Sequence, residues 1–186
     1  ANLQAQGVPG AGDLTNFRFY VNDFDTTTEG IDLVATYSTE MGNGVTDFTF
    51  VHSKTTTEVD KTSVLVGGAR IGQLESLLPE SRWNLTAVHN SGDWRVLARY
   101  NWIDEWIWWD IYSSPVFSEI VDDMMTLDLE VSRDFGDYTL TLGAQNLTDE
   151  YPDNPASTLC CGMKYPEGSP FGFNGAFYYF KLGLDF

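Results

Sequence analysis

Apolar and polar residues alternate with a period of two along much of this chain. In the stretch 94–102, Trp94 and Val96 fall on one face of an extended chain, opposite Arg95 and Arg99. The same alternation recurs in residues 126–132, 138–145 and 177–186. Because successive side chains of an extended strand point to opposite faces, this pattern predicts β-strands with one apolar or aromatic face and one polar face.

The alternating segments and the turn residues between them predict seven strands, which cover residues 16–41, 44–59, 81–90, 93–108, 122–135, 137–150 and 173–186. Three connections are short and contain the Gly, Asn and Asp that tight hairpins need, near residues 42–44, 91–93 and 136–137. The other connections are long and cover residues 60–80, 109–121 and 151–172. The stretch RIGQLESLLPE predicts one short helix, which Pro79 limits to about two turns.

Short and long connections take turns along the chain, so the short turns gather at one end of the predicted sheet and the long loops at the other. This arrangement is typical of an outer-membrane β-barrel. A soluble β-sandwich also alternates, but its strands are usually shorter than the 10 to 15 residues, roughly, that are predicted for most strands of this chain. Aromatic residues collect near the predicted strand ends, where an interface between lipid and water favours them. They are Trp83, Trp94, Trp102, Trp106 and Tyr151. The predicted fold class is therefore all-β, an antiparallel transmembrane β-barrel segment with short periplasmic turns and long extracellular loops in a lipid bilayer.

The charge of the chain excludes two classes of partner. The 186 residues carry a net charge of −17, and the pI is about 4.1. Such a polyanion repels nucleic acid and anionic bilayer surfaces, so neither is expected as a partner. The charge forms either a solvated surface or an attraction for a cationic ligand. No apolar run is long enough for a transmembrane helix, and no secretory signal opens the chain, which is therefore expected to be a mature form or a piece of something longer.

Few side chains suggest enzymatic or metal chemistry. His52 and His89 fall on separate strands without an obvious serine partner, so no enzymatic activity is predicted. Cys160 and Cys161 are adjacent and lack zinc-ligand spacing, so they form either a strained vicinal disulfide or two thiols in a loop. An acidic group around the loop 109–121 forms either a solvated rim or a calcium site. Its members are Asp104, Glu105, Asp110, Asp122 and Asp123. No cofactor and no structural metal site are predicted.

The stretch LTLGAQNLTDEYP resembles the penultimate-strand motif of TonB-dependent outer-membrane receptors. Asn146, Leu147, Asp149 and Tyr151 hold its motif positions, and the final stretch GAFYYFKLGLDF is similar to the last strand of these receptors. Two earlier stretches, YVNDFDTTTEGIDLVATYS and LPESRWNLTAVHNSGDWRVLARYNW, resemble other passages of the same receptors. The resemblance covers nearly the whole chain, and its passages occur in the order found in the family.

Receptors of this family have a 22-stranded barrel around an N-terminal plug domain, so the resemblance implies that residues 1–186 are the C-terminal part of such a barrel, about seven strands without the plug. It implies an outer-membrane location in a Gram-negative bacterium and active uptake of a scarce nutrient such as a ferric siderophore. The implied partners are the plug and N-terminal strands of the receptor, the TonB complex acting through the plug, the outer-membrane assembly machinery, the lipid bilayer and lipopolysaccharide. The alternative is a small passive or structural outer-membrane β-barrel protein, against which the odd strand number and the receptor motif argue.

Aromatic residues are the candidate functional residues. Trp106, Trp108 and Trp109 precede a long loop, where they either stack on a flat ligand or complete the outer aromatic girdle, which is the favoured interpretation. Phe186 ends the sequence on the apolar face of the last predicted strand. The resemblance implies that Phe186 is part of the signal read by the assembly machinery. The alternative is that Phe186 simply completes the apolar belt, and both roles are compatible.

Overall fold

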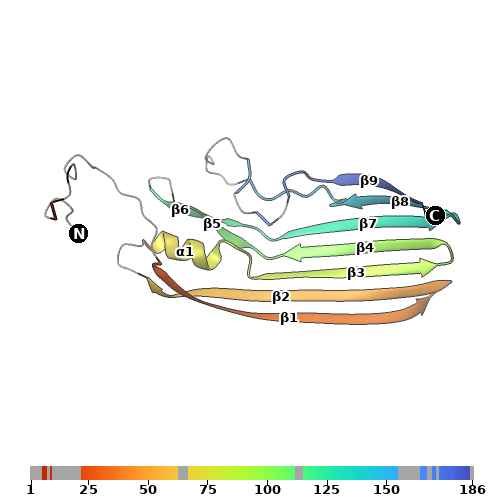
Figure 1. Cartoon of the computed structure of the whole chain (residues 1–186), viewed down its shortest axis with the longest axis horizontal. Coiled ribbons are helices and arrows are strands. Elements are labelled where there is room, and N and C mark those ends of the chain that lie inside the picture. The colour runs from red at the N-terminus through yellow and green to blue at the C-terminus, as the bar shows by residue number, and fades with distance from the viewer. Residues whose placement is uncertain are drawn as a thin grey trace.

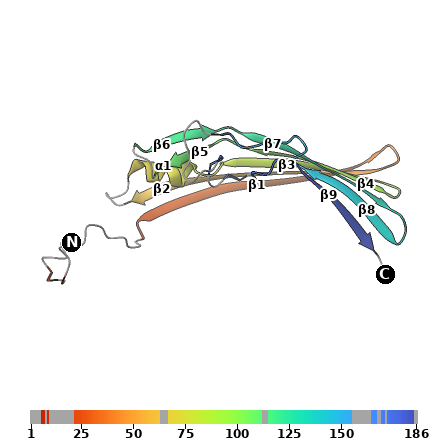
Figure 2. The ribbon, with the colours of Figure 1, turned by 90° about the horizontal axis from the view of Figure 1, so that it is seen from above.

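The computed structural model describes residues 6–7, 9, 22–62, 67–111, 115–154, 164–166, 169–170 and 172–184. These residues form mostly antiparallel β-sheet with one helix, which confirms the all-β class. Seven strands make one sheet in the order β1-β2-β3-β4-β7-β8-β9, and two further strands, β5 and β6, make a second sheet. The large sheet extends along the longest axis of the molecule in Figure 1, and Figure 2 shows it from above as a single curved layer.

The large sheet joins strands that are neighbours along the chain or flank the β5–β6 hairpin. Its strands are β1 (Phe24–Met41), β2 (Gly44–Thr62), β3 (Ser81–Ser91), β4 (Trp94–Ile103), β7 (Met124–Asp134), β8 (Tyr138–Gln145) and β9 (Phe177–Leu184). Gly42 and Gly92 turn the chain between β1 and β2 and between β3 and β4, with φ of 59° and 55°, a left-handed conformation that glycine adopts without strain. Together with the β7–β8 turn they define the turn end of the sheet, and the longer connections define the loop end (Figure 1).

The single strand predicted for residues 93–108 and the loop predicted for 109–121 are both wrong. β4 stops at Ile103, and a hairpin of β5 (Trp106–Asp110) and β6 (Phe117–Val121) lies beyond it. Ile103 pairs with Met124 and, past the break, Trp106 pairs with Val121. The β5–β6 hairpin therefore continues the β4–β7 pair in the same register.

Acidic residues interrupt this long hairpin at Asp104, Glu105, Asp122 and Asp123. The backbone N–H of Asp104 donates to the carbonyl of Ser81 at 3.0 Å. The N–H of Asp122 donates to the Asp153 carboxylate at 2.8 Å. The Asp104 bond continues the β3–β4 pairing, whereas the Asp122 N–H bonds outside the β4–β7 pair, and the pairing of Ile103 with Met124 resumes only at Trp106 and Val121.

Other element boundaries differ less from the prediction. Helix α1 (Gly68–Ser76) confirms the predicted short helix, and it ends before Pro79. β8 ends at Gln145 instead of residue 150, because the chain turns at Asn146 and Asp149 with φ of 49° and 58°. β9 begins at Phe177 instead of residue 173, and residues 16–21 of the first predicted strand lie outside the described residues.

The register gives the large sheet two unlike faces, as the alternation predicts. One face, called the apolar face below, carries the cross-strand rows Phe50–Leu85–Tyr100 and Val131–Leu142–Phe180. The opposite face, called the polar face, carries rows such as Asn84–Asn101–Thr126. Leu142 and Phe180 are 58% and 62% exposed, and no second sheet covers the apolar face within the described part of the chain.

Buried apolar side chains gather at the loop end instead of on the large sheet. Trp106, Trp108 and Val121 form a core cluster, with Leu77 and Phe117 packed against it. Helix α1 packs against β2 and β5, so the helix and the β5–β6 hairpin form one small packed unit at the loop end of the sheet (Figure 1).

Candidate functional site

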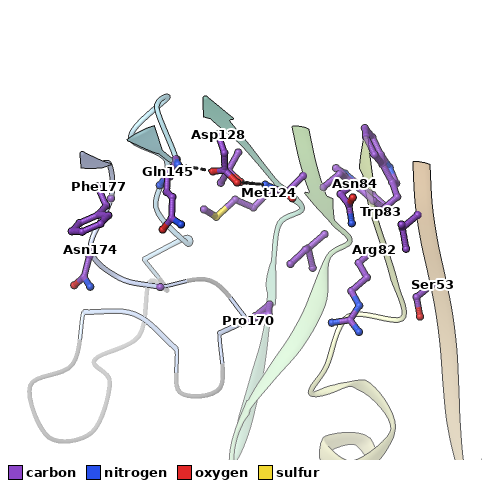
Figure 3. Close-up of a pocket in the computed structure, with 18 of the residues that line it drawn as sticks. Ser53, Arg82, Trp83, Asn84, Met124, Asp128, Gln145, Pro170, Asn174 and Phe177 are labelled. Atoms are coloured by element: carbon purple, nitrogen blue, oxygen red, sulfur yellow. Dashed lines mark hydrogen bonds between the residues drawn. The ribbon is translucent and has the colours of Figure 1, made fainter. Parts of the chain in front are cut away.

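A cavity of about 760 Å³ opens on the polar face near the loop end. Strands β2, β3, β4, β7 and β8 form one wall, and the chain around Pro170 and Asn174 borders the cavity on the other side (Figure 3). The lining is rich in hydrogen-bonding side chains, among them Arg82, Asn84, Asn101, Asp128, Gln145 and Asn174. Amide and carboxylate groups of this kind suit a polar ligand better than an apolar one.

Asp128 organises the β7 side of this cavity. Its Oδ2 accepts a hydrogen bond from Asn101 Nδ2 at 3.2 Å, and its Oδ1 accepts one from the backbone N–H of Asn146 at 2.9 Å. Asn101 Nδ2 also donates to Thr126 Oγ1 at 3.2 Å. Asp128 therefore joins the polar face of β4 and β7 to the residue at which β8 ends.

The turn that follows β8 is held by side chains of the receptor-like motif. Asn146 Oδ1 accepts from the N–H of Glu150 at 3.0 Å, and Asn146 Nδ2 donates to the Glu150 carbonyl at 2.8 Å. The N–H of Leu147 donates to the carbonyl of Leu127 at 2.7 Å. These bonds fold the chain back and fasten the turn to β7.

Asp149 fastens the same turn to the start of β9. Its Oδ1 accepts a hydrogen bond from the N–H of Ala176 at 2.8 Å. Gly175, with φ of 62°, packs so closely against the Tyr151 ring that an added Cβ would lie 2.5 Å from Cζ of Tyr151. A hydrogen bond with the Asp149 carboxylate raises the pKa of Tyr151 above its usual value. Through these hydrogen bonds Asn146, Leu147 and Asp149 connect the end of β8 to β7 and to the start of β9, beside the cavity.

Aromatic rings stack beside this turn. The ring centroids of Tyr151 and Tyr165 are 6.0 Å apart, and those of Tyr165 and Phe173 are 5.6 Å apart, in nearly parallel planes. Lys164 Nζ lies 5.0 Å from the Tyr165 ring centroid, and a hydrogen bond with the Tyr165 hydroxyl raises the pKa of Lys164. The stack holds parts of the β8–β9 connection against each other next to the cavity.

A charged network lies on the polar face toward the turn end. Glu130 accepts from Arg95 Nη1 at 2.9 Å through one carboxylate oxygen, and from Lys181 Nζ at 3.0 Å and the Tyr179 hydroxyl at 2.8 Å through the other. Gly143 lies between Glu130 and Tyr179 in the register. The missing side chain at Gly143 leaves room for the Tyr179 ring to cross β8 and reach Glu130.

The three tryptophans named as ligand candidates have packing partners. Trp106 and Trp108 are 3% and 7% exposed in the core cluster, away from the cavity lining. Trp109 donates from Nε1 to Ser76 Oγ at 3.0 Å, and its ring lies over Gly72 of α1. In this structure their rings therefore hold the loop-end unit together, and the buried rings of Trp106 and Trp108 present no face on which a ligand could stack.

Other sequence-predicted residues fall outside the cavity. Cys160, Cys161 and Phe186 lie outside the described residues. Among the described residues, no three His, Cys, Asp or Glu side chains form a group that could hold a metal ion. Within the acidic group, Asp123 accepts from Trp102 Nε1 at 2.6 Å, and Asp104 accepts from the N–H of Glu105 at 3.0 Å.

The structure gives each histidine a hydroxyl neighbour that the sequence did not reveal. His52 Nε2 lies 2.9 Å from Ser81 Oγ, and His89 Nδ1 lies 2.8 Å from Thr46 Oγ1. In the described part of the chain no carboxylate bonds to either imidazole, and neither histidine lines the cavity. The arrangement links neighbouring strands.

Sequence reasoning missed the cavity residues Arg82, Asn84, Asn101 and Asp128. The available signal was their position in the polar set of the alternation, which placed them on one face but did not distinguish them from other polar residues. No helix in the described part of the chain is long and apolar enough to cross a membrane. No protein-family model, curated protein or solved structure matches this chain.

Proposed function

We propose that this chain forms part of the wall of a TonB-dependent receptor, which imports a scarce nutrient such as a ferric siderophore across the outer membrane of a Gram-negative bacterium. One observation carries the proposal: a single-layer sheet leaves a wide apolar face uncovered while its polar face holds a hydrogen-bonded network and a cavity. A lipid bilayer covers such a face without a second protein layer.

The height of the apolar face supports this placement. From Trp94 to Trp102 the strand rises about 26 Å, at roughly 3.3 Å per residue. At the tilt of about 40° that is usual in membrane barrels, this corresponds to about 20 Å across the membrane, close to the apolar band of about 25 Å in such proteins.

Aromatic side chains mark both limits of the apolar face. At the loop end the Trp83 ring centroid lies 6.1 Å from that of Phe50 and 6.2 Å from that of Trp102. At the turn end Phe135 stacks on Tyr138 at 5.3 Å. Aromatic rings at both limits are what two interfaces between lipid and water favour, although further rings such as Phe48 and Phe180 lie between them.

The receptor-like motif supports the particular family. Its residues Asn146 and Asp149 clip the last strands together beside the cavity, which gives a structural reason for their presence. β1 and β9 are the edge strands of the sheet, and open edges are not tolerated in lipid. In the proposed receptor, further barrel strands pair with both edges, and the plug faces the polar side.

Membrane placement is tested with nitroxide labels on adjacent residues of the full-length receptor in vesicles, in a C160S/C161S background. Tyr37 lies on the apolar face and Ser38 on the polar face, and both are exposed. We expect a label at Tyr37→Cys to collide mainly with oxygen, which concentrates in lipid, and a label at Ser38→Cys to collide mainly with a water-soluble nickel chelate. Equal collision rates at the two positions would contradict the membrane placement.

Transport is tested by growth of a deletion strain on a panel of ferric chelates, cobalamin and glycans. We expect the strain to lose the use of one compound and the full-length gene to restore it only when the TonB complex is intact. Uptake that persists without the TonB complex would favour a passive barrel over a receptor. The polar lining of the cavity leads us to expect a hydrogen-bonding ligand.

A further inference from the structure

Arg133 lies among aromatic rings at the turn end of the apolar face. It pairs with Trp94 on β4 and with Leu140 on β8, both of which belong to the apolar face. Its Cζ lies 4.8 Å from the centroid of the Trp94 ring and 4.8 Å from that of the Phe135 ring. Phe135 in turn stacks on Tyr138. Trp94, Phe135 and Tyr138 are each between 41% and 47% exposed, so the cluster is open to the surroundings.

The guanidinium of Arg133 has ring faces around it but no anionic partner within the described part of the chain. No carboxylate there lies within ion-pair distance, and its buried Nε has no hydrogen-bond acceptor. Arg95, on the polar face of the neighbouring strand, differs because it pairs with Glu130 at 2.9 Å. Because Nε is buried, an anion that arrives together with apolar groups would bind this guanidinium through its Nη groups and stabilise the charge on the apolar surface.

We propose that Arg133, Trp94, Phe135 and Tyr138 bind the phosphate group of a glycerophospholipid in the leaflet at the turn end. An arginine fork matches two phosphate oxygens, and the aromatic rings fix the plane of the fork. The cluster lies at the limit of the apolar face, where head groups meet acyl chains, and Leu142 and Val131 continue the surface along which an acyl chain lies. This inference rests on the proposed membrane placement.

Native mass spectrometry of the full-length receptor tests the proposal, with phosphatidylglycerol added to the delipidated protein in mild detergent. We expect Arg133→Gln to weaken binding of the most tightly retained lipid by roughly tenfold or more, as expected for loss of a charge-assisted pair. Arg133→Lys keeps the charge without the fork, so we expect an intermediate loss. The matched control is Arg99→Gln on the polar face, where Arg99 donates to Thr86 Oγ1 at 3.2 Å, and it should retain the lipid.

Several outcomes would overturn the site. One is that Arg133→Gln retains the lipid as well as the unaltered receptor does, and another is that Arg99→Gln loses as much lipid as Arg133→Gln. A third is that no protein, altered or unaltered, retains a lipid. The fourth is that inorganic phosphate alone displaces the lipid, which would indicate a free-phosphate site. A gel shift between heated and unheated samples checks that each variant is folded, and Arg133→Lys serves as the test if Arg133→Gln is not. The nitroxide labels at residues 37 and 38 report membrane placement separately, so loss of this lipid site would leave the proposed receptor intact.

Discussion

Replacement of Gly143 tests the network that joins the last three strands. In the structure the Tyr179 ring crosses β8 over Gly143, and its hydroxyl donates to Glu130 at 2.8 Å. A Cβ at position 143 would lie 2.6 Å from Cε2 of Tyr179 and closer still to Cζ. Gly143→Ala therefore forces the tyrosine ring away from β8 and breaks its bond to Glu130, while Arg95 and Lys181 keep theirs.

The expected magnitude follows from two opposing effects. A hydrogen bond to a charged group contributes roughly 1.5 to 3 kcal/mol to stability. Replacing a glycine within a strand recovers about 0.5 to 1 kcal/mol, because glycine loses more backbone entropy on folding than alanine. We expect Gly143→Ala to lower the free energy of unfolding by about 1 to 2 kcal/mol.

The chain offers a matched control for this substitution. Gly183 lies on β9, and a Cβ there would meet Thr139 atoms only at 3.8 Å and 3.9 Å, an ordinary contact. Gly183→Ala should be neutral or stabilising by about 0.5 kcal/mol. A second arm places Gly143→Ala in a Tyr179→Ala background, where the ring is gone and the substitution should be neutral or stabilising.

The assay is urea unfolding of the full-length protein in detergent micelles, followed by tryptophan fluorescence. Two results would refute the reasoning. One is a cost of Gly143→Ala no greater than that of Gly183→Ala. The other is an equal cost in the Tyr179→Ala background, which would mean that the tyrosine ring is not what the new side chain disturbs.

Three further predictions concern the loop end. Gly72→Ala should loosen α1 from the β5–β6 hairpin, because the added Cβ would lie 2.8 Å from Cε2 of Trp109. Amide hydrogen exchange of residues 68–76 should then be faster than in the unaltered protein. The control Gly68→Ala should leave this exchange unchanged, because a Cβ at position 68 meets nothing within 4 Å. Asn146→Ala should cost about 2 kcal/mol in urea unfolding and Asn146→Gly less, because both lose the side-chain bonds but only alanine is strained at φ 49°. Asp149→Asn should lower the pKa of Tyr151 toward its usual value, because the carboxylate that raises it is removed. A raised pKa keeps the phenol neutral to higher pH, so in an alkaline absorbance titration one tyrosine should ionise at lower pH in the variant than in the unaltered protein. An unchanged titration would contradict the hydrogen bond between Tyr151 and Asp149.

The number and approximate positions of the strands in the large sheet were the part of the fold that the sequence predicted best. Alternation along residues 94–102 fixed which side chains share a face, and the glycines at 42 and 92 fixed two turns. The β5–β6 hairpin was missed because its strands are five residues each, too short for alternation to be read with certainty. Its packing depends on Trp109 meeting Gly72 of α1, a contact between distant segments that no local pattern carries.

The cavity was harder to predict from the sequence for a related reason. Alternation placed Asn84, Asn101 and Asp128 on the polar face, but it did not distinguish them from the other polar residues of that face. Their grouping depends on the chain around Asn174 returning to border them, which the bond from Ala176 to Asp149 helps to fix. This contact joins segments that are far apart in the sequence, and the one residue of the receptor-like motif that makes it is Asp149.

The distribution of buried side chains connects the fold to its proposed surroundings. Among the described residues, the buried apolar side chains other than proline are Trp106, Trp108, Val121, Met124 and Ala144. So few buried side chains, at about 1.5 to 3 kcal/mol each, contribute little to the stability of a sheet of this size. In the proposed receptor, transfer of the apolar face into lipid and pairing of the β1 and β9 edges would add further stabilisation. The alternation that leaves one face of this sheet apolar and uncovered among the described residues is therefore the feature that the proposed membrane wall would use.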